Sequence, residues 1–273
     1  MRCSSITRNR TLHGLSLQGS YTYSKALSDS AGDGSNRFEP FLDINNPKIE
    51  KARTINDLTH AIKGNGVYDL PFGKGHAIDW RPLGRVIGGW QIGSLLTWQS
   101  GTPFSILSGR DTLNRTGRST YNTANTSLTK SRLNDIVQFQ MTGNGPTFIV
   151  PSAINPADGR GVAPDGSAPF SSQVFSNPGA GTIGALQRRD FNGPWDFDMD
   201  FALIKKTHLT ERQTLELRMD ATNVFNHPSF QVLDQPLNTS TITNINVNST
   251  TFGRVANLAF DRRLIQLSLF YRF

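Results

Sequence analysis

An all-β fold is predicted by three observations on the sequence. Only 18% of the 273 residues are charged, against about 25% in ordinary globular domains, while 25 Gly, 14 Pro and 17 Phe favour strands and turns. Apolar and polar residues alternate along six segments, with the period of a strand that has one apolar face. No segment approaches the ~18 consecutive apolar residues of a membrane-spanning helix. Strands therefore have to form the framework.

The alternation is clearest in the fourth segment. Aromatic and aliphatic residues follow Trp195 at every second position, and Asp196, Asp198 and Asp200 occupy the positions between them. The first and last segments show the same period, with polar residues opposite Leu, Ile and Tyr. The six predicted strands lie near residues 14–25, 58–70, 90–106, 195–205, 213–226 and 263–273.

The connections between these segments alternate in length. Short turns follow the second and fourth segments, but long polar stretches follow the others, at residues 26–57, 109–193 and 227–263. Such loops are uncommon in compact soluble domains, whereas outer-membrane barrels have long extracellular loops and short periplasmic turns. We therefore predict that residues 1–273 form an antiparallel transmembrane β-barrel segment, about six strands of a larger barrel, with long extracellular loops.

The two faces of these strands predict two environments. Transmembrane strands are apolar toward lipid and polar toward the lumen, and aromatic rings collect at the membrane interfaces. The aromatic residues predicted to face lipid are Tyr21, Tyr23, Trp90, Trp98, Trp195, Phe197 and Phe201. The polar residues predicted to face the lumen are Asp196, Asp198, Asp200, Glu216, Arg218 and Asp220. The wet side of a soluble sheet would explain the same alternation.

The carboxy terminus carries a further pattern. The chain ends on an aromatic residue and has apolar residues at every second place before it, namely Ile265, Leu267, Leu269, Tyr271 and Phe273. This ending resembles the terminal assembly signal of bacterial outer-membrane barrels, which the barrel-assembly machinery recognises. A core strand that ends in Phe by chance is the alternative.

Several sequence blocks carry a family resemblance. They are Tyr21–Lys25, Tyr68–Gly75, Gly89–Gln91, Gln99–Phe104, Leu217–Phe230, Phe252–Arg254 and Arg263–Phe273. In this order they resemble the end of a TonB-dependent outer-membrane receptor, closest to the Oar-like receptors with a carboxypeptidase-regulatory-like amino-terminal domain. The resemblance implies a plugged barrel of 22 strands in a Gram-negative-type outer membrane, and ligand uptake driven by the TonB complex.

The sequence departs from that family pattern at its amino-terminal side. We recognise no plug, TonB box or signal peptide in it, so we expect the last part of a larger receptor, truncated or given a false start at Met1. Alone it would not be competent for transport. Ligand contacts are expected from the long loops 26–57, 109–193 and 227–251, which otherwise are variable surface. The rivals are a small outer-membrane porin or translocator and a soluble β-sandwich that binds carbohydrate or another ligand.

Other function classes find little support in the residues. The aspartates at 196, 198 and 200 begin like a calcium loop, but Phe201 and Thr207 replace the required Gly and Glu. The five His and the single Cys have no metal-ligand or catalytic spacing, so we expect no enzyme activity, metal or cofactor. The net charge of +7 is scattered along the chain, and no nucleic-acid partner is expected.

Overall fold

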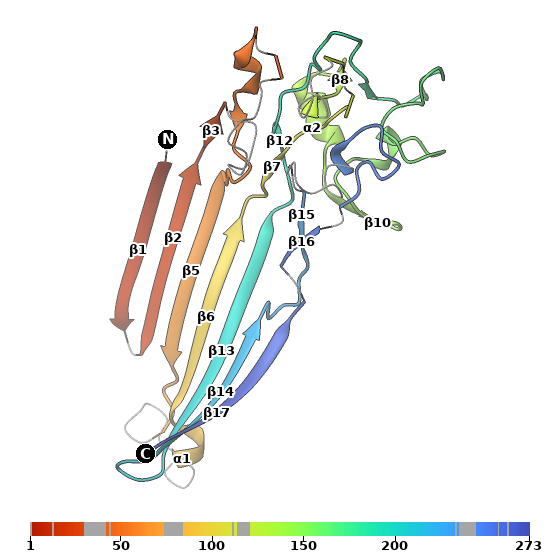
Figure 1. The fold of residues 1–273 in the computed structure, drawn as a ribbon. Coiled ribbons are helices and arrows are strands. Elements are labelled where there is room, and N and C mark those ends of the chain that lie inside the picture. The colour runs from red at the N-terminus through yellow and green to blue at the C-terminus, as the bar shows by residue number, and fades with distance from the viewer. Residues whose placement is uncertain are drawn as a thin grey trace.

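A long antiparallel sheet forms a wall, and a cap of loops stands at one of its ends (Figure 1). The computed structural model describes residues 2–12, 14–29, 42–43, 45–73, 84–110, 112–113, 121–232, 234, 244–255, 257–260 and 262–273. Seven strands make up the wall, which confirms the predicted all-β, antiparallel fold class.

The wall is a meander in which each of its strands pairs with the next strand of the wall. Its strands are β1 (Arg2–Leu12), β2 (Leu15–Ser24), β5 (His60–Asp69), β6 (Trp90–Gln99), β13 (Asp196–His208), β14 (Thr214–Thr222) and β17 (Leu264–Arg272). All six pairings are antiparallel. Five of the strands lie within their predicted ranges, β13 starts in the predicted range 195–205 but continues to His208, and β1 is additional.

Two differences from the predicted strands have local causes. The sequence of β1, RCSSITRNRTL, is polar at most positions, so no alternation marks it as a strand. The predicted third strand, 90–106, is divided, because β6 ends at Gln99 and the chain leaves the wall at Gly101. A side chain at Gly101 would overlap the carbonyl oxygens of Gly193 and Pro194. Beyond it, β7 (Pro103–Phe104) pairs with β12 (Phe191–Asn192) in the cap.

The connections follow the predicted alternation. Residues 13–14, 70–89 and 209–213 connect strands at the end opposite the cap, where α1 (Gly84–Ile87) also lies (Figure 1). Residues 25–59, 100–195 and 223–263 are the three long connections, and they leave the sheet at the other end. The described residues of these three long connections make up the cap.

The hydrogen-bond register divides the wall into an apolar face and a polar face. Phe201 pairs with Ala221, which pairs with Ile265, so these three side chains share one face. Extending the register gives an apolar face of Leu15, Leu17, Tyr21, Tyr23, Ile62, Tyr68, Trp90, Ile92, Leu96, Trp98, Phe197, Met199, Phe201, Leu203, Leu215, Leu217, Met219, Ala221, Ile265, Leu267, Leu269 and Tyr271. In β2 to β17 of the wall, every Asp and Glu lies on the other face.

The cap is built from short elements. They are β3 (Leu27–Ser28), η1 (Pro47–Glu50), β4 (Ala52–Arg53), β7, β8 (Asn125–Thr126), α2 (Lys130–Ile136), β9 (Gln140–Thr142), β10 (Gly145–Thr147), η4 (Pro151–Ala153), β11 (Phe175–Ser176), β12, β15 (Ser229–Gln231) and β16 (Asn257–Phe260). They pair as four two-stranded sheets besides β7 and β12. Within the described residues, no helix has the length and apolar character needed to cross a membrane.

The hydrophobic core of the molecule lies in the cap. Phe104 packs edge-on against Phe148, with ring centroids 4.9 Å apart, and Phe252 contacts Phe148 and Phe175 at 6.3 and 5.6 Å. All four rings are almost completely buried. The buried cluster draws its residues from 104 to 255, and none of them belongs to the apolar face of the wall. The apolar face therefore has no covering layer in the described structure, as a β-sandwich would require.

Candidate functional site on the polar face and at the rim of the cap

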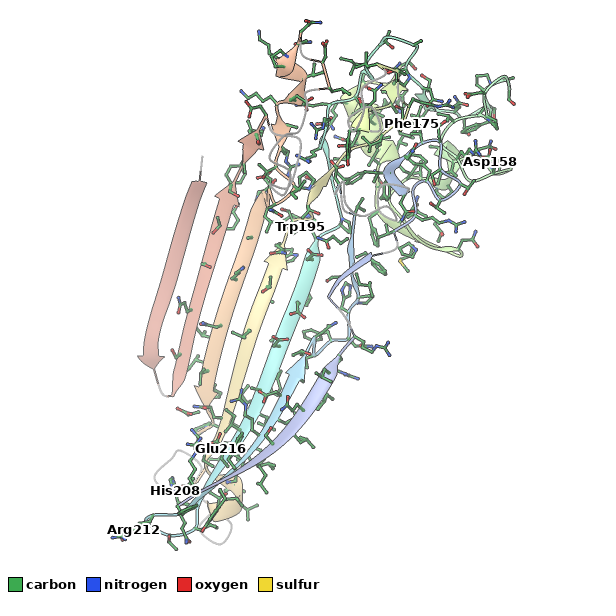
Figure 2. The ribbon with its side chains drawn as sticks, in the orientation of Figure 1. Asp158, Phe175, Trp195, His208, Arg212 and Glu216 are labelled. Atoms are coloured by element: carbon green, nitrogen blue, oxygen red, sulfur yellow. The ribbon has the colours of Figure 1, made fainter. Side chains whose placement is uncertain are left out.

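An aromatic row crosses the apolar face where the wall meets the cap. His60 stacks between Tyr21 and Trp195, with centroids 6.2 and 5.8 Å away, and Trp195 contacts Trp98 at 5.4 Å. The Tyr21 hydroxyl and His60 Nδ1 are hydrogen bonded at 2.9 Å. Figure 2 shows Trp195 at this junction. The prediction named the Tyr and Trp residues but missed His60, because only the register shows that it joins them.

A second group of aromatic residues lies at the opposite end of the same face. It contains Tyr68, Trp90 and Tyr271, and the Tyr271 ring lies 5.9 Å from that of Phe273. On β6, Trp90 and Trp98 mark the two ends of a nine-residue stretch. At ~3.3 Å per residue the rows are about 26 Å apart along the strand. Membrane-crossing barrel strands have about this length, ~9–11 residues.

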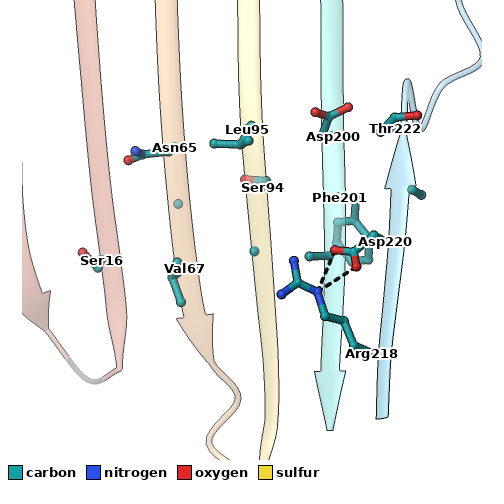
Figure 3. Close-up of a pocket in the computed structure, with 14 residues that line it drawn as sticks. Ser16, Asn65, Val67, Ser94, Leu95, Asp200, Phe201, Arg218, Asp220 and Thr222 are labelled. Atoms are coloured by element: carbon teal, nitrogen blue, oxygen red, sulfur yellow. Dashed lines mark hydrogen bonds and ion pairs between the residues drawn. The ribbon is translucent and has the colours of Figure 1, made fainter. Parts of the chain in front are cut away.

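The polar face carries a hollow of about 400 Å³ near its centre (Figure 3). Its floor lies at Gly93 and Ala202, which pair across β6 and β13 and leave room because both side chains are small. Beside it, Arg218 Nε donates to both carboxylate oxygens of Asp220, at 3.0 and 2.7 Å. Leu95 also lines the hollow and is 57% exposed.

The six polar residues predicted to face the lumen share one face but form three separate groups. Near the cap, the carboxylates at 196, 198 and 200 form a column along β13. Arg218 and Asp220 form an ion pair at the hollow. Glu216 forms an ion pair with Arg272 at 3.4 Å, near the short turns. Figure 2 shows Glu216 near the turn that carries His208 and Arg212. Among the described residues, no three His, Cys, Asp or Glu side chains group as they would around a metal ion.

Buried charges join the three long connections of the cap. Arg188 Nη1 donates to Glu50 Oε2 at 2.5 Å, which links the first and second connections. Arg189 Nε and Ser105 Oγ both donate to Asp234 Oδ2, at 3.2 and 2.6 Å, which links the second and third. Because charged pairs this deep are costly to break, the three connections are held as one body. No sequence pattern indicated these pairs, since their members are 45 to 138 positions apart.

A further set of hydrogen bonds fixes the base of the first long connection, residues 25–59. Arg53 Nε donates to Asp57 at 2.7 Å, and Asp57 also accepts the N–H of Ala26 at 2.7 Å. The carbonyl oxygen of Arg53 accepts a hydrogen bond from Arg189 Nη1 at 3.1 Å. Hydrogen bonds thus join the base of the first connection to the second connection.

The terminal strand presents the predicted assembly residues together. Ile265, Leu267, Leu269 and Tyr271 lie on the apolar face of β17 and are all exposed, as is Phe273 after it. β17 is an edge strand that pairs with β14 alone in the described sheet. Its other backbone edge faces away from the wall.

Comparison with known families matches this architecture. A sequence model described as "Outer membrane beta barrel domain" matches residues 6–266, nearly the whole chain. The chain belongs to this family. No curated protein and no solved structure matches it. Membership of the outer membrane beta barrel domain family establishes an outer-membrane location and contact with membrane lipid, and it removes the soluble β-sandwich alternative.

Proposed function

We propose that this barrel chain is the carboxy-terminal part of a TonB-dependent, Oar-like receptor that takes up a ligand across the outer membrane. In the intact receptor, the TonB complex would supply the energy through a more amino-terminal part. The ordered sequence blocks from Tyr21 to Phe273 support the receptor class, and the cap supports a role in ligand capture.

The topology of the wall is the observation that carries this proposal. β1 and β17 are the first and last of seven antiparallel strands, so they run in the same direction. Closing the wall on itself would create a parallel pair, whereas bacterial barrels are antiparallel throughout and have an even number of strands. An unpaired edge in lipid costs several kcal/mol per backbone group. An odd number of further strands would complete an antiparallel barrel, and the 22 strands of the receptor class meet this condition with 15 more.

The chemistry of the two faces indicates how the wall would be oriented within such a barrel. The apolar face, with its two aromatic rows, would contact lipid, and the polar face would line the lumen. Leu95 and Val67 are 57% and 42% exposed on the polar face, although water would disfavour them. A plug that packs against this face would cover both side chains. The barrel-assembly machinery would recognise the residues of β17. No enzyme activity is proposed.

Expression of the complete reading frame in its own outer membrane tests this proposal. A receptor should migrate as a heat-modifiable barrel, and a photo-crosslinker at its amino-terminal box should capture TonB. Tyr271→Ser with Phe273→Ser should lower the amount of assembled barrel, while Arg272→Ser, a neighbour on the polar face, serves as the matched control. An in-frame stop directly upstream of Met1 without receptor coding sequence would contradict the proposal. So would a stable, heat-modifiable barrel formed by residues 1–273 alone in detergent micelles.

A further inference from the structure

A buried carboxylate without a full set of partners lies where the polar face meets the cap. Asp196 begins β13 and is only 3% exposed. Its Oδ2 accepts a long hydrogen bond of 3.4 Å from Gln99 Nε2, and its Oδ1 is buried with no hydrogen-bond partner among the described residues. Buried polar atoms are nearly always hydrogen bonded, and an orphaned charged one costs free energy. This oxygen therefore lacks a hydrogen-bond donor, which a group from outside the described structure would supply.

Two more carboxylates continue from Asp196 along the same face. Asp198 and Asp200 follow at every second position, so consecutive carboxylates are about 7 Å apart along the strand. Asp200 Oδ1 is engaged by the N–H of Asn223 at 3.1 Å. Asp196 and Asp198 form the open end of the column, directly beneath the cap.

The residues paired with this column do not neutralise it. On β6 its partners are Gln99, Thr97 and Leu95, which are all uncharged. On the other side, β14 pairs with β13 only from Phe201 onward, and its Arg218 lies opposite Ile204 and is bound to Asp220. Lys63 lies opposite Thr97, two strands from Asp198, which is about 9.6 Å at the usual strand spacing. Among the described residues, Asp196 and Asp198 thus have no ion-pair partner, although the net charge of the chain is +7.

We propose that Asp196 and Asp198 bind a positively charged group, an ammonium or a guanidinium, of the molecule that enters the lumen beneath the cap. Ionised carboxylates only accept hydrogen bonds, and such cations supply several donors with the complementary charge. This inference rests on the proposed function for the path of the ligand, and it adds the chemical class of the ligand.

Cysteine reactivity in the assembled protein tests the site. The complete reading frame would carry Cys3→Ser and a reporter at Thr97→Cys, directly opposite Asp198, with Gln18→Cys on the polar face of β2 as the control position. The reagents are trimethylammonioethyl and sulfonatoethyl methanethiosulfonate, and the readout is the ratio of their rates. We expect this cation-to-anion ratio to be about tenfold higher at 97 than at 18.

Charge removal identifies the groups responsible. Asp196→Asn with Asp198→Asn should lower the ratio at position 97 by about tenfold and leave that at position 18 unchanged. Heat-modifiability reports whether each variant assembles, and Asp198→Asn alone carries the test if the double variant does not. Equal ratios at both positions, or no response to the Asn variants, would overturn the proposal.

Competition with a soluble cation tests whether a ligand or a segment of the protein occupies the two carboxylates. Spermidine should slow the reaction at Thr97→Cys by severalfold, whereas succinate at the same ionic strength should not. If both reagents fail at position 97 in the assembled protein, a segment of the protein already occupies the carboxylates and the ligand proposal is wrong. These rates require no transport, so their outcome is separate from TonB capture, which tests the receptor proposal.

Discussion

In the cap many large apolar side chains form a buried core, whereas on the apolar face of the wall they are exposed or half-buried. Phe104 and Ile106 are fully buried, while Leu267 and Leu269, on β17, are 71% and 66% exposed. The two regions are continuous in the chain and share residues of the same types. Their difference shows that they are folded for different surroundings.

The cap is stabilised as a water-soluble domain is. Its apolar side chains gain about 25 cal/mol for each Å² removed from water, and its buried charges are paired. The wall has no such core, and within it the backbone hydrogen bonds of the strands hold the elements together. Its apolar face needs lipid in place of the missing layer. The outer membrane, in which this family is located, provides that lipid.

A large-to-small change should affect the cap far more than the wall. Phe252→Ala removes a ring that contacts Phe148 and Phe175, and we expect a loss of about 3–5 kcal/mol from the stability of the cap. Leu267→Ala on β17 is the matched control, because lipid fills the space that its side chain leaves. Hydrogen exchange of cap amides in the assembled barrel measures both. If both variants lost the same protection from hydrogen exchange, the cap and the wall would not differ in how they are stabilised.

Removing a buried charge should separate the connections of the cap. Asp234→Ala takes away the carboxylate that Arg189 and Ser105 bind, and we expect a cost of about 3 kcal/mol. The cost is at the lower end for a buried pair because Arg189 keeps its bond to the carbonyl of Arg53. Protease cleavage within the cap should accelerate, while Glu211→Ala in the exposed β13–β14 turn should leave it unchanged. An unaltered cleavage rate for Asp234→Ala would show that the three connections are not held as one body.

An added charge should destabilise the protein at one residue of β17 and have little effect at the residue next to it. Leu267→Arg places a guanidinium on the apolar face, and we expect a loss of about 2–4 kcal/mol if that position lies near the middle of the bilayer. Gln266→Arg places the same group on the polar face, opposite Asp220, and should cost little. Unfolding in urea from lipid vesicles, with the complete barrel, measures both variants. A larger loss for Gln266→Arg would reverse the assignment of the two faces.

The wall could be predicted from the sequence better than the cap, for a physical reason. A strand with one apolar face has a period of two, which short windows such as 195–205 display directly. Packing inside the cap has no period, because Phe104, Phe148 and Phe252 meet through irregular connections whose composition is that of polar loops. The strand β1 was missed for a related reason, since its polar sequence has no alternation.

The candidate site shows the same division. Alternation predicts that the six lumen residues share one face, and the register places all six on the polar face. Their separation into a column, a central pair and a distal pair depends on which strands are neighbours, and alternation does not specify that. Alternation likewise does not specify the burial of Asp196, and His60 joins the aromatic row only through the pairing of β2 with β5.

The smallest expected effect concerns an exposed ion pair at the surface of the cap. Both carboxylate oxygens of Asp165 accept hydrogen bonds from Arg110, at 2.7 and 2.8 Å. The hydrogen bonds and the charge of Arg110 lower the pKa of Asp165 from its ordinary value of 3.8. The stabilisation is therefore complete above pH 3.8, and it is lost as the pH falls through the lowered pKa.

Protease cleavage near residue 165 as a function of pH checks this effect, with a pepsin-type protease that acts in acid. The rate, normalised to an unstructured peptide, should be constant from pH 6 to about 4 and should rise below the ordinary carboxyl pKa. Asp165→Asn should already show the faster rate at pH 6 and lack this rise. Because the pair is exposed, salt should weaken it, so the difference between the two proteins should shrink at high ionic strength. A rise in the wild-type protein that begins well above pH 4 would mean that another carboxylate controls this part of the cap.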